Sequence, residues 1–337
     1  MDIGEIARHV GVSRSTVSYA LSGKRPVSEE TRRRVQAAVE SLGYRPNAAA
    51  RALKEGRTRT IGLVVPPASA HLTHMQMDFV AGVLEAAAAV DLDVLLSPSG
   101  PRHEKSFERL VTGRRVDGVM LMEIRLDDLR VERLARSSMP FVTIGRTRYS
   151  DDLSWVDVDY AALVERCVQV LADLGHNDVV LLNRSTALVS AGYGPADRAS
   201  AGFERAIAAR GLHGSEECCD DDPTAGDKCL SEILQRKPQA TAAVTINEAA
   251  LPGFERALRR AGREVPRDFS IVGVAARLWA ESFHPQLTAA DVPAAEIAST
   301  GVELLLERIA DPSAPPRHVL ICPPISWRAS TGQRSRS

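Results

Sequence analysis

Hydrophobic positions recur with two different periods along the chain, and the change of period near residue 59 divides it into two parts. Before that point apolar residues return every three or four positions, the spacing of one face of an α-helix. This spacing predicts helices over residues 3–10, 13–21 and 28–42. Beyond it, short apolar runs alternate with helical stretches, a pattern that predicts parallel strands joined by helices.

The second part repeats this alternation in two successive blocks. The first block contains predicted strands 60–65, 92–97, 117–122 and 140–145 and predicted helices 75–90, 103–113 and 127–136. The second follows residues 156–159 with predicted strands 178–183, 241–246 and 270–274 and predicted helices 160–174, 196–210, 226–236 and 248–262. Residues 287–309 are predicted to return to the first block, and strands near 317–329 to cross once more. The predicted fold class is α/β, with two parallel α/β lobes behind a helical N-terminal domain.

The first two predicted helices meet at a turn with a characteristic spacing. Gly11 ends the first helix, because a glycine adopts positive φ at little cost. Ser13 is then the expected N-cap of the second helix, on which Val17 and Leu21 fall on one face. Ala7, Gly11 and Val17 together have the spacing of a helix-turn-helix: a small residue at the helix contact, a turn glycine and a core residue.

The third predicted helix starts after Ser28, an expected N-cap, and ends at Gly43. Glu29 and Glu30 occupy its first turn, where the helix dipole favours negative charge. Three consecutive arginines, residues 32–34, lie near its start. A protein-interaction module with a solvated basic face is an alternative interpretation of these three helices.

Charge is distributed unevenly along a chain that is nearly neutral overall. Residues 1–60 contain 12 Lys or Arg and 6 Asp or Glu, whereas the remaining residues contain 30 and 37. A basic N-terminal domain on an acidic body is typical of a protein whose first domain touches nucleic acid. We find no N-terminal signal sequence and no apolar stretch of about 20 residues, so we expect a cytoplasmic protein with no membrane partner.

The first 60 residues resemble the DNA-binding headpiece of the lactose-repressor (LacI/GalR) family of bacterial transcription regulators. The resemblance rests on AxxxGVSxxTVSxxLxG, followed by RPVSEETRRRVQAAVESLGYRPNAAARAL. It implies that residues 13–21 form the recognition helix in the major groove. It also implies that Arg14, Ser15 and Tyr19 contact base edges. Thr16 and Ser18 then occupy positions that contact phosphates. Tyr19 departs from the arginine often found at its position.

Residues 47–55 (NAAARALKE) match the hinge helix of the same family. Nine residues are too few for a stable isolated helix, so we expect DNA and a second subunit to order it. The resemblance implies DNA contacts from this segment, with Leu53 inserted as a wedge into the minor groove. The residues concerned are Asn47, Ala50, Arg51 and Leu53. Packing of Leu53 against its own headpiece is the alternative.

The two lobes are similar to the family's bilobed effector domain, which is akin to periplasmic sugar-binding proteins. The matching segments are VDGVMLM, PFVTIGR, VDVDYAA, LADLGH, AGFERA and ELLLERI. The predicted domains are a headpiece over residues 1–46, a hinge and linker over 47–59, and an effector-binding and dimerisation domain over 60–337. Ligands of such open sheets bind at the carboxyl ends of strands.

The resemblance implies that the effector binds in a cleft between the lobes. The residues expected to contact it are His71, Asp159, Arg198, Asn247 and Glu248. Asp159 and Asn247 have a simpler alternative, since either residue could merely cap the helix that follows it.

Several positions of the expected effector cleft depart from the family pattern. The arginine usual three residues before the glycine of AGF is replaced by Ala199, and Arg198 precedes it. The usual Asp-Asp after SIVGV is Ala275-Ala276. Because a sugar needs carboxylates to accept its hydroxyl protons, we hypothesise that the effector is not a simple hexose or that the pocket is vestigial.

The sequence offers little sign of catalysis or of a cofactor. The segment GYGPAD (residues 192–197) lacks the third glycine of a dinucleotide-binding loop and is predicted to be a loop. The motifs GxxxxGK[ST], HExxH and GxSxG do not occur, so we expect neither an enzyme nor a cofactor or metal. The five cysteines, an odd number, argue against a disulfide framework. They are Cys167, Cys218, Cys219, Cys229 and Cys322. Ordinary reduced thiols are the favoured interpretation, and a metal or redox role for 218, 219 and 229 is the alternative.

The sequence thus predicts a sequence-specific transcription regulator, most simply a repressor, that binds a palindromic operator in double-stranded DNA as a homodimer. A small molecule of unknown identity in the inter-lobe cleft is expected to control it allosterically. The alternative is a regulator of the same architecture controlled by a protein partner, or constitutively active, with a vestigial pocket.

Overall fold

The chain forms two compact units, residues Met1–Thr58 and Arg59–Ser337. The computed structural model describes residues 2–22, 25–43, 56–66 and 72–334. No described helix is long and apolar enough to cross a membrane. Each unit has its own hydrophobic core.

The first unit contains three helices, α1 (Ile3–Val10), α2 (Arg14–Ser22) and α3 (Glu29–Ser41). Their capping follows the sequence prediction, because Gly11 has φ 73° and the Ser28 side chain accepts from the Thr31 N–H. The helices enclose a small core that includes Ile6, Val17 and Val35, all fully buried. Leu21 was expected on this core face but is 37% exposed, and the buried residue of the last turn of α2 is Ala20.

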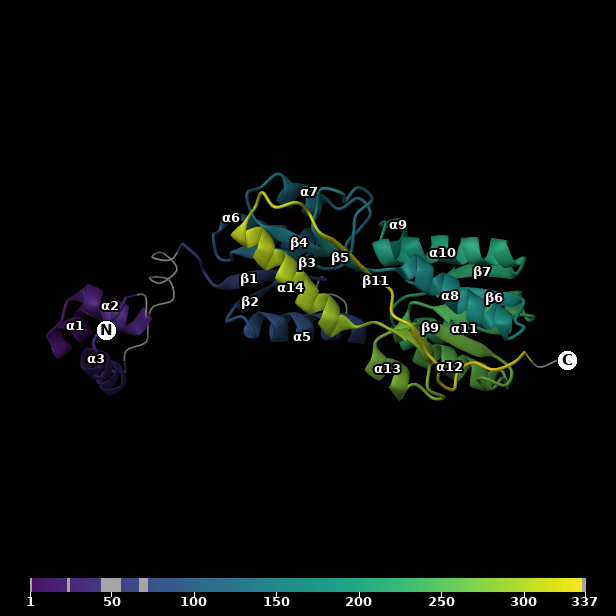
Figure 1. Ribbon diagram of the computed structural model, residues 1–337. Helices are drawn as coiled ribbons and strands as arrows, with labels where there is room; N and C mark the ends of the chain where they lie inside the picture. The colour runs from purple at the N-terminus through teal and green to yellow at the C-terminus, as the bar shows by residue number, and fades with distance from the viewer. Residues whose placement is uncertain (1, 23–24, 44–55, 67–71, 335–337) are drawn as a thin grey trace. The chain divides into compact units, whose positions relative to one another are not determined.

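The second unit contains two six-stranded sheets, which define two lobes (Figure 1). The first sheet has the order β11-β5-β4-β3-β1-β2 and is parallel throughout. Its strands are β1 (Thr60–Val65), β2 (Asp93–Pro98), β3 (Gly118–Leu121), β4 (Phe141–Ile144), β5 (Trp155–Val158) and β11 (His318–Ile321). Helices α5 (His74–Ala88) and α14 (Ala294–Ala310) pack on one face of it, and α6 (Glu104–Thr112) and α7 (Leu129–Ala135) on the other.

The second sheet has the order β12-β10-β9-β8-β6-β7, and only the β10–β12 pair is antiparallel. Its strands are β6 (Asp178–Asn183), β7 (His213–Cys218), β8 (Ala242–Thr245), β9 (Ser270–Ala275), β10 (Thr288–Asp291) and β12 (Ile325–Ser326). Helices α8 (Tyr160–Asp173) and α10 (Gly194–Arg210) cover one face, and α11 (Pro223–Arg236) and α12 (Leu251–Arg260) the other. Short helices α9 (Thr186–Ser190) and α13 (Arg277–Ser282) complete this lobe.

The chain crosses between the lobes three times within the described residues. It passes from β5 to α8, returns from β10 to α14, and crosses again from β11 to β12. The predicted crossings over residues 287–309 and 317–329 are therefore confirmed. One hydrophobic cluster extends through both lobes and includes residues from α5 and α14 as well as from α8 and α10.

The structure departs from the predicted elements in several places. Residues 192–197 were predicted to be a loop, but α10 begins at Gly194, because Pro195 is well suited to the first turn of a helix. Strand β7 was not predicted, since its sequence HGSEEC is polar and the strand lies at the sheet edge. The predicted helix 248–262 is a short 3₁₀ turn followed by α12, with Pro252 at the junction.

Candidate nucleic-acid interface and effector cleft

The helix-turn-helix geometry of the first unit depends on three positions. Ala7 is 5% exposed and Val17 is fully buried, so α1 and α2 approach closely through small and medium side chains. At Gly11 the backbone N–H returns to the Ala7 carbonyl, which closes α1 and turns the chain. A β-carbon at Gly11 would meet nothing within 4 Å, so the positive φ rather than space favours glycine there.

The N-terminus of α2 carries a group of hydroxyls. The Thr16 N–H donates to Ser13 Oγ at 3.0 Å, so Ser13 caps the helix as the sequence predicts. Ser13 Oγ also lies 2.7 Å from Ser15 Oγ and 2.8 Å from Thr16 Oγ1. Ser13, Arg14 and Ser15 are exposed, and hydroxyls at a helix N-terminus suit contact with phosphate oxygens.

Two of the predicted base-reading side chains make contacts within the unit. The Arg14 guanidinium lies against the backbone of Gly4, where an added β-carbon would be 2.6 Å from Arg14 Nε. The Arg25 guanidinium lies over the Tyr19 ring at 5.3 Å from its centre. Arg14 is exposed to solvent. The predicted contacts of Asn47, Ala50, Arg51 and Leu53 lie outside the described residues.

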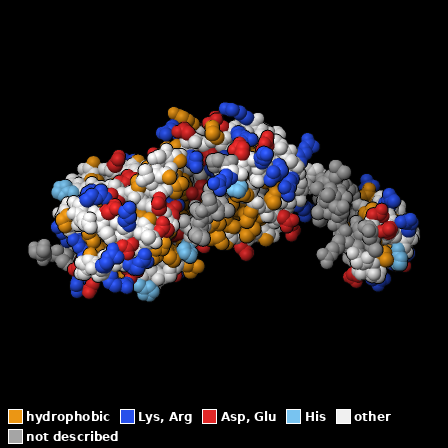
Figure 2. Space-filling view, turned by 180° about the vertical axis from the view of Figure 1, so that it is seen from behind, with side chains coloured by type: hydrophobic (Ala, Val, Ile, Leu, Met, Phe, Trp, Pro, Cys, Tyr) orange, Lys and Arg blue, Asp and Glu red, His pale blue; other side chains and the backbone are white. Residues whose placement is uncertain are grey.

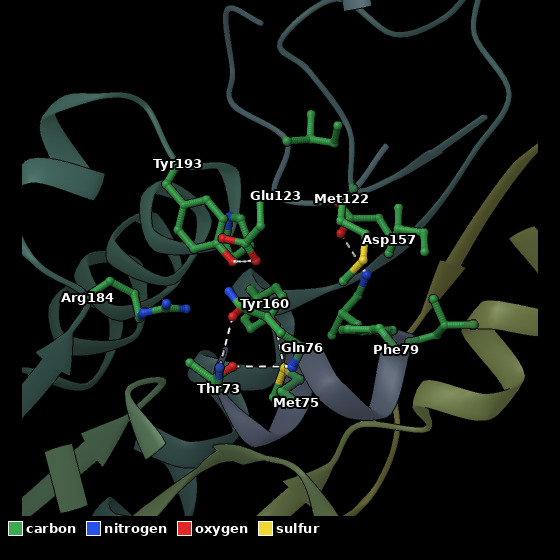
Figure 3. Close-up of a pocket in the computed structure, with 16 residues that line it drawn as sticks. Thr73, Met75, Gln76, Phe79, Met122, Glu123, Asp157, Tyr160, Arg184 and Tyr193 are labelled. Atoms are coloured by element: carbon green, nitrogen blue, oxygen red, sulfur yellow. Dashed lines mark hydrogen bonds between the residues drawn. The ribbon is translucent and has the colours of Figure 1, made fainter. Parts of the chain in front are cut away.

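In the second unit, polar side chains from the strand ends of both lobes surround a cavity of about 50 Å³ (Figure 3). Glu123 follows β3 and Asp157 belongs to β5 in the first lobe, while Arg184 follows β6 in the second. Tyr160 and Tyr193 supply aromatic walls. A neighbouring cavity of about 20 Å³ adds Asn247 and Glu248. The larger cavity has room for a few water molecules.

Asp157 is the most buried carboxylate of the cavity wall. It is 5% exposed, and its Oδ2 lies 3.2 Å from Arg146 Nε without a well-directed hydrogen bond. Burial raises the pKa of Asp157 to about 6, although the charges of Arg198 and Arg146 oppose this shift. Asp157 is therefore expected to gain a proton as the pH falls through about 6.

Arg184 links the cavity to the end of β7. Its Nε and Nη2 donate to the two carboxylate oxygens of Asp221 at 2.8 and 2.7 Å. The guanidinium also lies 5.2 Å from the centre of the Tyr193 ring, and the Tyr193 hydroxyl donates to Glu123 Oε1 at 3.0 Å. Burial raises the pKa of Tyr193, so this phenol remains a hydrogen-bond donor.

Glu248 joins the two lobes. Its Oε1 accepts from the Met75 N–H of the first lobe at 2.9 Å, and its Oε2 from the Ala276 N–H of the second at 3.0 Å. Burial raises the pKa of Glu248, which is 4% exposed. Trp279 donates from Nε1 to the Glu248 carbonyl and stacks on His74 of the first lobe at 4.4 Å.

The predicted effector residues have different positions in the structure. Asn247 lines the smaller cavity and donates to the Cys219 and Asn183 carbonyls, so it does not serve as a helix cap. Asp159 caps α8 by accepting from the Ala162 N–H, and it lines neither of the two cavities described above. Arg198 also lines neither of these cavities, and it donates to the Arg146 carbonyl at 2.9 Å. His71 lies outside the described residues.

The small residues at the departing positions are all buried. Ala199, Ala275 and Ala276 are each at most 2% exposed, so helix and sheet pack where polar side chains were expected. We did not predict Glu123, Asp157, Arg184 or Tyr193 from the sequence. The first three follow or end parallel strands, a position that marks ligand-binding groups in open sheets.

Comparisons with known proteins agree with both units. The model of bacterial regulatory proteins of the lacI family matches residues 2–47, and a periplasmic binding protein-like domain matches residues 168–331. The transcriptional regulator AglR of Rhizobium meliloti (strain 1021) is 33% identical over 297 residues, which cover 86% of this chain and 82% of AglR. The chain belongs to the lacI family. It is a DNA-binding transcriptional regulator, and the resemblance inferred from its motifs is confirmed.

Solved structures of this family share the fold. A complex of the transcriptional regulator CelR with cellobiose is 27% identical, with a TM-score of 0.73 over 98% of this chain and 99% of that one. The lac repressor dimer bound to operator and the anti-inducer ONPF is 23% identical, with a TM-score of 0.86 over the same shares of the two chains.

The cysteines of this lacI-family chain are all free thiols in the structure. Cys219 and Cys167 are buried, whereas Cys218 is exposed. Among the described residues, no group of three or more His, Cys, Asp and Glu side chains is arranged to hold a metal ion.

Proposed function

We propose that this lacI-family protein binds a palindromic operator as a homodimer in the cytoplasm and represses transcription under the control of a small effector. The observation that carries the DNA-binding part is the N-terminus of α2. There Ser13, Arg14 and Ser15 are exposed, while Val17 and Ala20 of the same helix are buried. A helix with its core face buried and its N-terminal side chains exposed is suited to enter the major groove.

The proposed contacts divide by chemistry. Arg14 is suited to a guanine, since its guanidinium can donate two hydrogen bonds to O6 and N7. Ser15 and Tyr19 are the other proposed base contacts, and the hydroxyls of Thr16 and Ser18 are suited to phosphates. In this proposal residues 47–55 make further contacts with the operator, in addition to those of α2.

Exposed apolar side chains on the first lobe support the homodimer. Met77 and Leu84 on α5 are 51% and 43% exposed, and Leu96 on the adjacent β2 is 48% exposed. Figure 2 shows hydrophobic side chains gathered along the edge of this lobe where α5 lies. Because a palindrome has two-fold symmetry, a second copy is the natural occupant of this surface.

The cleft between the lobes is the proposed effector site. Its wall combines apolar side chains such as Phe79 and Ile144 with the carboxylates of Glu123 and Asp157, the mixture expected of a small-molecule site. A cavity of about 50 Å³ is much smaller than the roughly 300–1,000 Å³ of ligand pockets, so an effector must separate the lobes to enter. The relative CelR has been solved with cellobiose.

We keep the hypothesis that the effector is not a simple hexose, because Ala275 and Ala276 offer no carboxylate to sugar hydroxyls. Calorimetric titration with common monosaccharides tests it, and tight binding of any one of them contradicts it.

The second candidate is control by a protein partner, or none, with a vestigial pocket. The observation that favours it is that protein groups already bind three charged side chains of the cleft. Asp221 binds Arg184, two backbone N–H groups bind Glu248, and Tyr193 binds Glu123. Operator affinity that no metabolite changes, but that a purified partner changes, would favour this candidate.

The test of DNA recognition is selection of binding sites from a random pool by the full-length protein. We expect a palindrome bound by two copies, with an affinity that falls steeply as salt rises, because phosphate contacts release counterions. Leu53→Ala is expected to weaken binding to all selected sites. Recovery of no preferred sequence would contradict the proposal.

A further inference from the structure

The segment GYGPAD, which begins like a nucleotide-binding loop, has a different role in the structure. Residues 192–194 of the second lobe lie antiparallel to residues 124–126 of the first, in an isolated bridge between Arg125 and Tyr193. The Leu126 N–H donates to the Gly192 carbonyl at 2.7 Å, and the Gly194 N–H donates to the Ile124 carbonyl at 3.0 Å. We name these two segments the inter-lobe clasp.

The glycines of the clasp are required by its geometry. Gly192 has φ 69°, a conformation that other residues adopt at a cost. A β-carbon on Gly194 would lie 2.5 Å from Arg198 Nη1 and 3.1 Å from the Ile124 carbonyl oxygen. A larger residue at 194 would therefore displace the Arg198 guanidinium and crowd the Ile124 carbonyl across the clasp.

Tyr193 extends the clasp into the effector cleft. Its side chain is 6% exposed, its ring lies beside the Arg184 guanidinium, and its hydroxyl donates to Glu123. Figure 3 shows the Tyr193 ring and the Glu123 carboxylate facing one another in the cavity wall. Glu123 itself has φ 56°, a strained conformation for a residue with a side chain.

We propose that the clasp holds the lobes closed without an effector, and that Tyr193 occupies the cleft as a built-in competitor of the effector. This inference rests on the proposed effector site. It implies that a ligand enters only when the bridge between residues 124–126 and 192–194 opens. A ligand that replaces Tyr193 must bring a hydroxyl or amino hydrogen to Glu123, since that carboxylate otherwise loses its donor.

Trp279 offers a direct measure of lobe closure in the full-length protein. Its ring stacks on His74 of the other lobe, so opening exposes it to a quencher. Trp155→Phe and Trp327→Phe leave Trp279 as the only tryptophan, because the chain has three. Acrylamide quenching is then measured without DNA or effector.

In this background Tyr193→Phe removes one hydrogen bond to a charged group and keeps the ring. Loss of such a bond is expected to shift the closed-to-open equilibrium about tenfold or more toward the open form. We expect increased quenching of Trp279. Gly194→Ala is expected to act in the same direction, and Glu123→Gln, which still accepts from Tyr193, to have a smaller effect. The matched control is Tyr149→Phe, since Tyr149 is 83% exposed and outside the clasp.

Quenching of Tyr193→Phe and Gly194→Ala equal to that of the control, in variants whose circular dichroism is unchanged, would overturn the proposal. If Tyr193→Phe loses its fold, Gly194→Ala decides, and quenching by this variant equal to that of the control would also overturn the proposal. Operator affinity is measured separately on the same variants. Unchanged quenching with retained operator selection would mean that this inference fails and the DNA-binding function stands. Increased quenching with no operator selection would mean the opposite.

Discussion

The N-terminal unit and the inter-lobe cleft place their polar side chains in opposite ways. In α2 the hydroxyls and the arginine come from neighbouring residues and face solvent. In the cleft the polar groups come from strand ends far apart in sequence, are mostly buried, and are bound to one another. The side chains of α2 can contact a rigid partner without rearrangement. The side chains of the cleft must exchange their present contacts before they can bind a ligand.

The largest expected effect tests whether the two units fold independently. Ile6 is fully buried in the small core of the first unit, so Ile6→Ala is expected to cost about 2–5 kcal/mol of its folding free energy. Such a loss exceeds what a core of this size can tolerate. We expect loss of operator binding and rapid proteolysis of residues 2–43, with unchanged melting of the second unit.

The matched control for this variant is Leu21→Ala, at a position that is 37% exposed on the neighbouring helix. It is expected to leave the protease resistance of the first unit nearly unchanged. A parallel drop in the melting temperature of the second unit in Ile6→Ala would contradict independent folding.

The next effect concerns the charge buried in the cleft. The pKa of Asp157 is raised from an ordinary value of 3.8 to about 6, so the unfolded chain loses this proton at lower pH than the folded one. The stabilising contribution of Asp157 is complete below pH 3.8 and is lost as pH rises through 6, with a change of about 3 kcal/mol.

The comparison of wild type with Asp157→Asn isolates this contribution, because other titrating groups are common to both. Denaturant unfolding at pH 4.5 and 7.5 is the measurement. We expect the wild type to lose stability relative to Asp157→Asn between the two values. If the unfolding free energies of the two proteins changed with pH in parallel, the raised pKa of Asp157 would be contradicted.

The smallest effect concerns base recognition by α2. Arg14→Ala is expected to cost about 1–3 kcal/mol at one symmetric pair of operator positions and to relax the preference there. Arg8, in the last turn of α1, serves as a matched arginine outside α2. Competition binding with operators substituted at each position makes the comparison, and a uniform loss across all positions would assign Arg14 to phosphates instead.

The headpiece was predictable because its determinants are local. Gly11, Ser13 and Ser28 act within a few residues of their own position, so the caps and turns follow from the sequence and were found as expected. The buried strands of the body were predictable for a similar reason, since their apolar runs are continuous. Leu21 was misplaced because two adjacent residues, 20 and 21, compete for the core face of one helical turn.

The cleft was less predictable because its geometry depends on distant segments. Asp221 holds the Arg184 side chain at the cleft by hydrogen bonds. Tyr193 is held by Glu123, which lies seventy residues earlier in the chain. No local pattern distinguishes these residues from ordinary polar positions. Asp159 shows the converse, since the role that the structure gives it, the cap of α8, is the local alternative that its sequence position already offered.

The central claim is that the first unit reads DNA sequence and does not merely bind the charge of DNA. The most direct measurement is the ratio of affinities for a selected operator and a scrambled duplex of equal composition, at several salt concentrations. We expect a ratio of at least about 10³. We also expect that both affinities fall as salt rises while the preference for the operator remains. A ratio near one at every salt concentration would contradict the account.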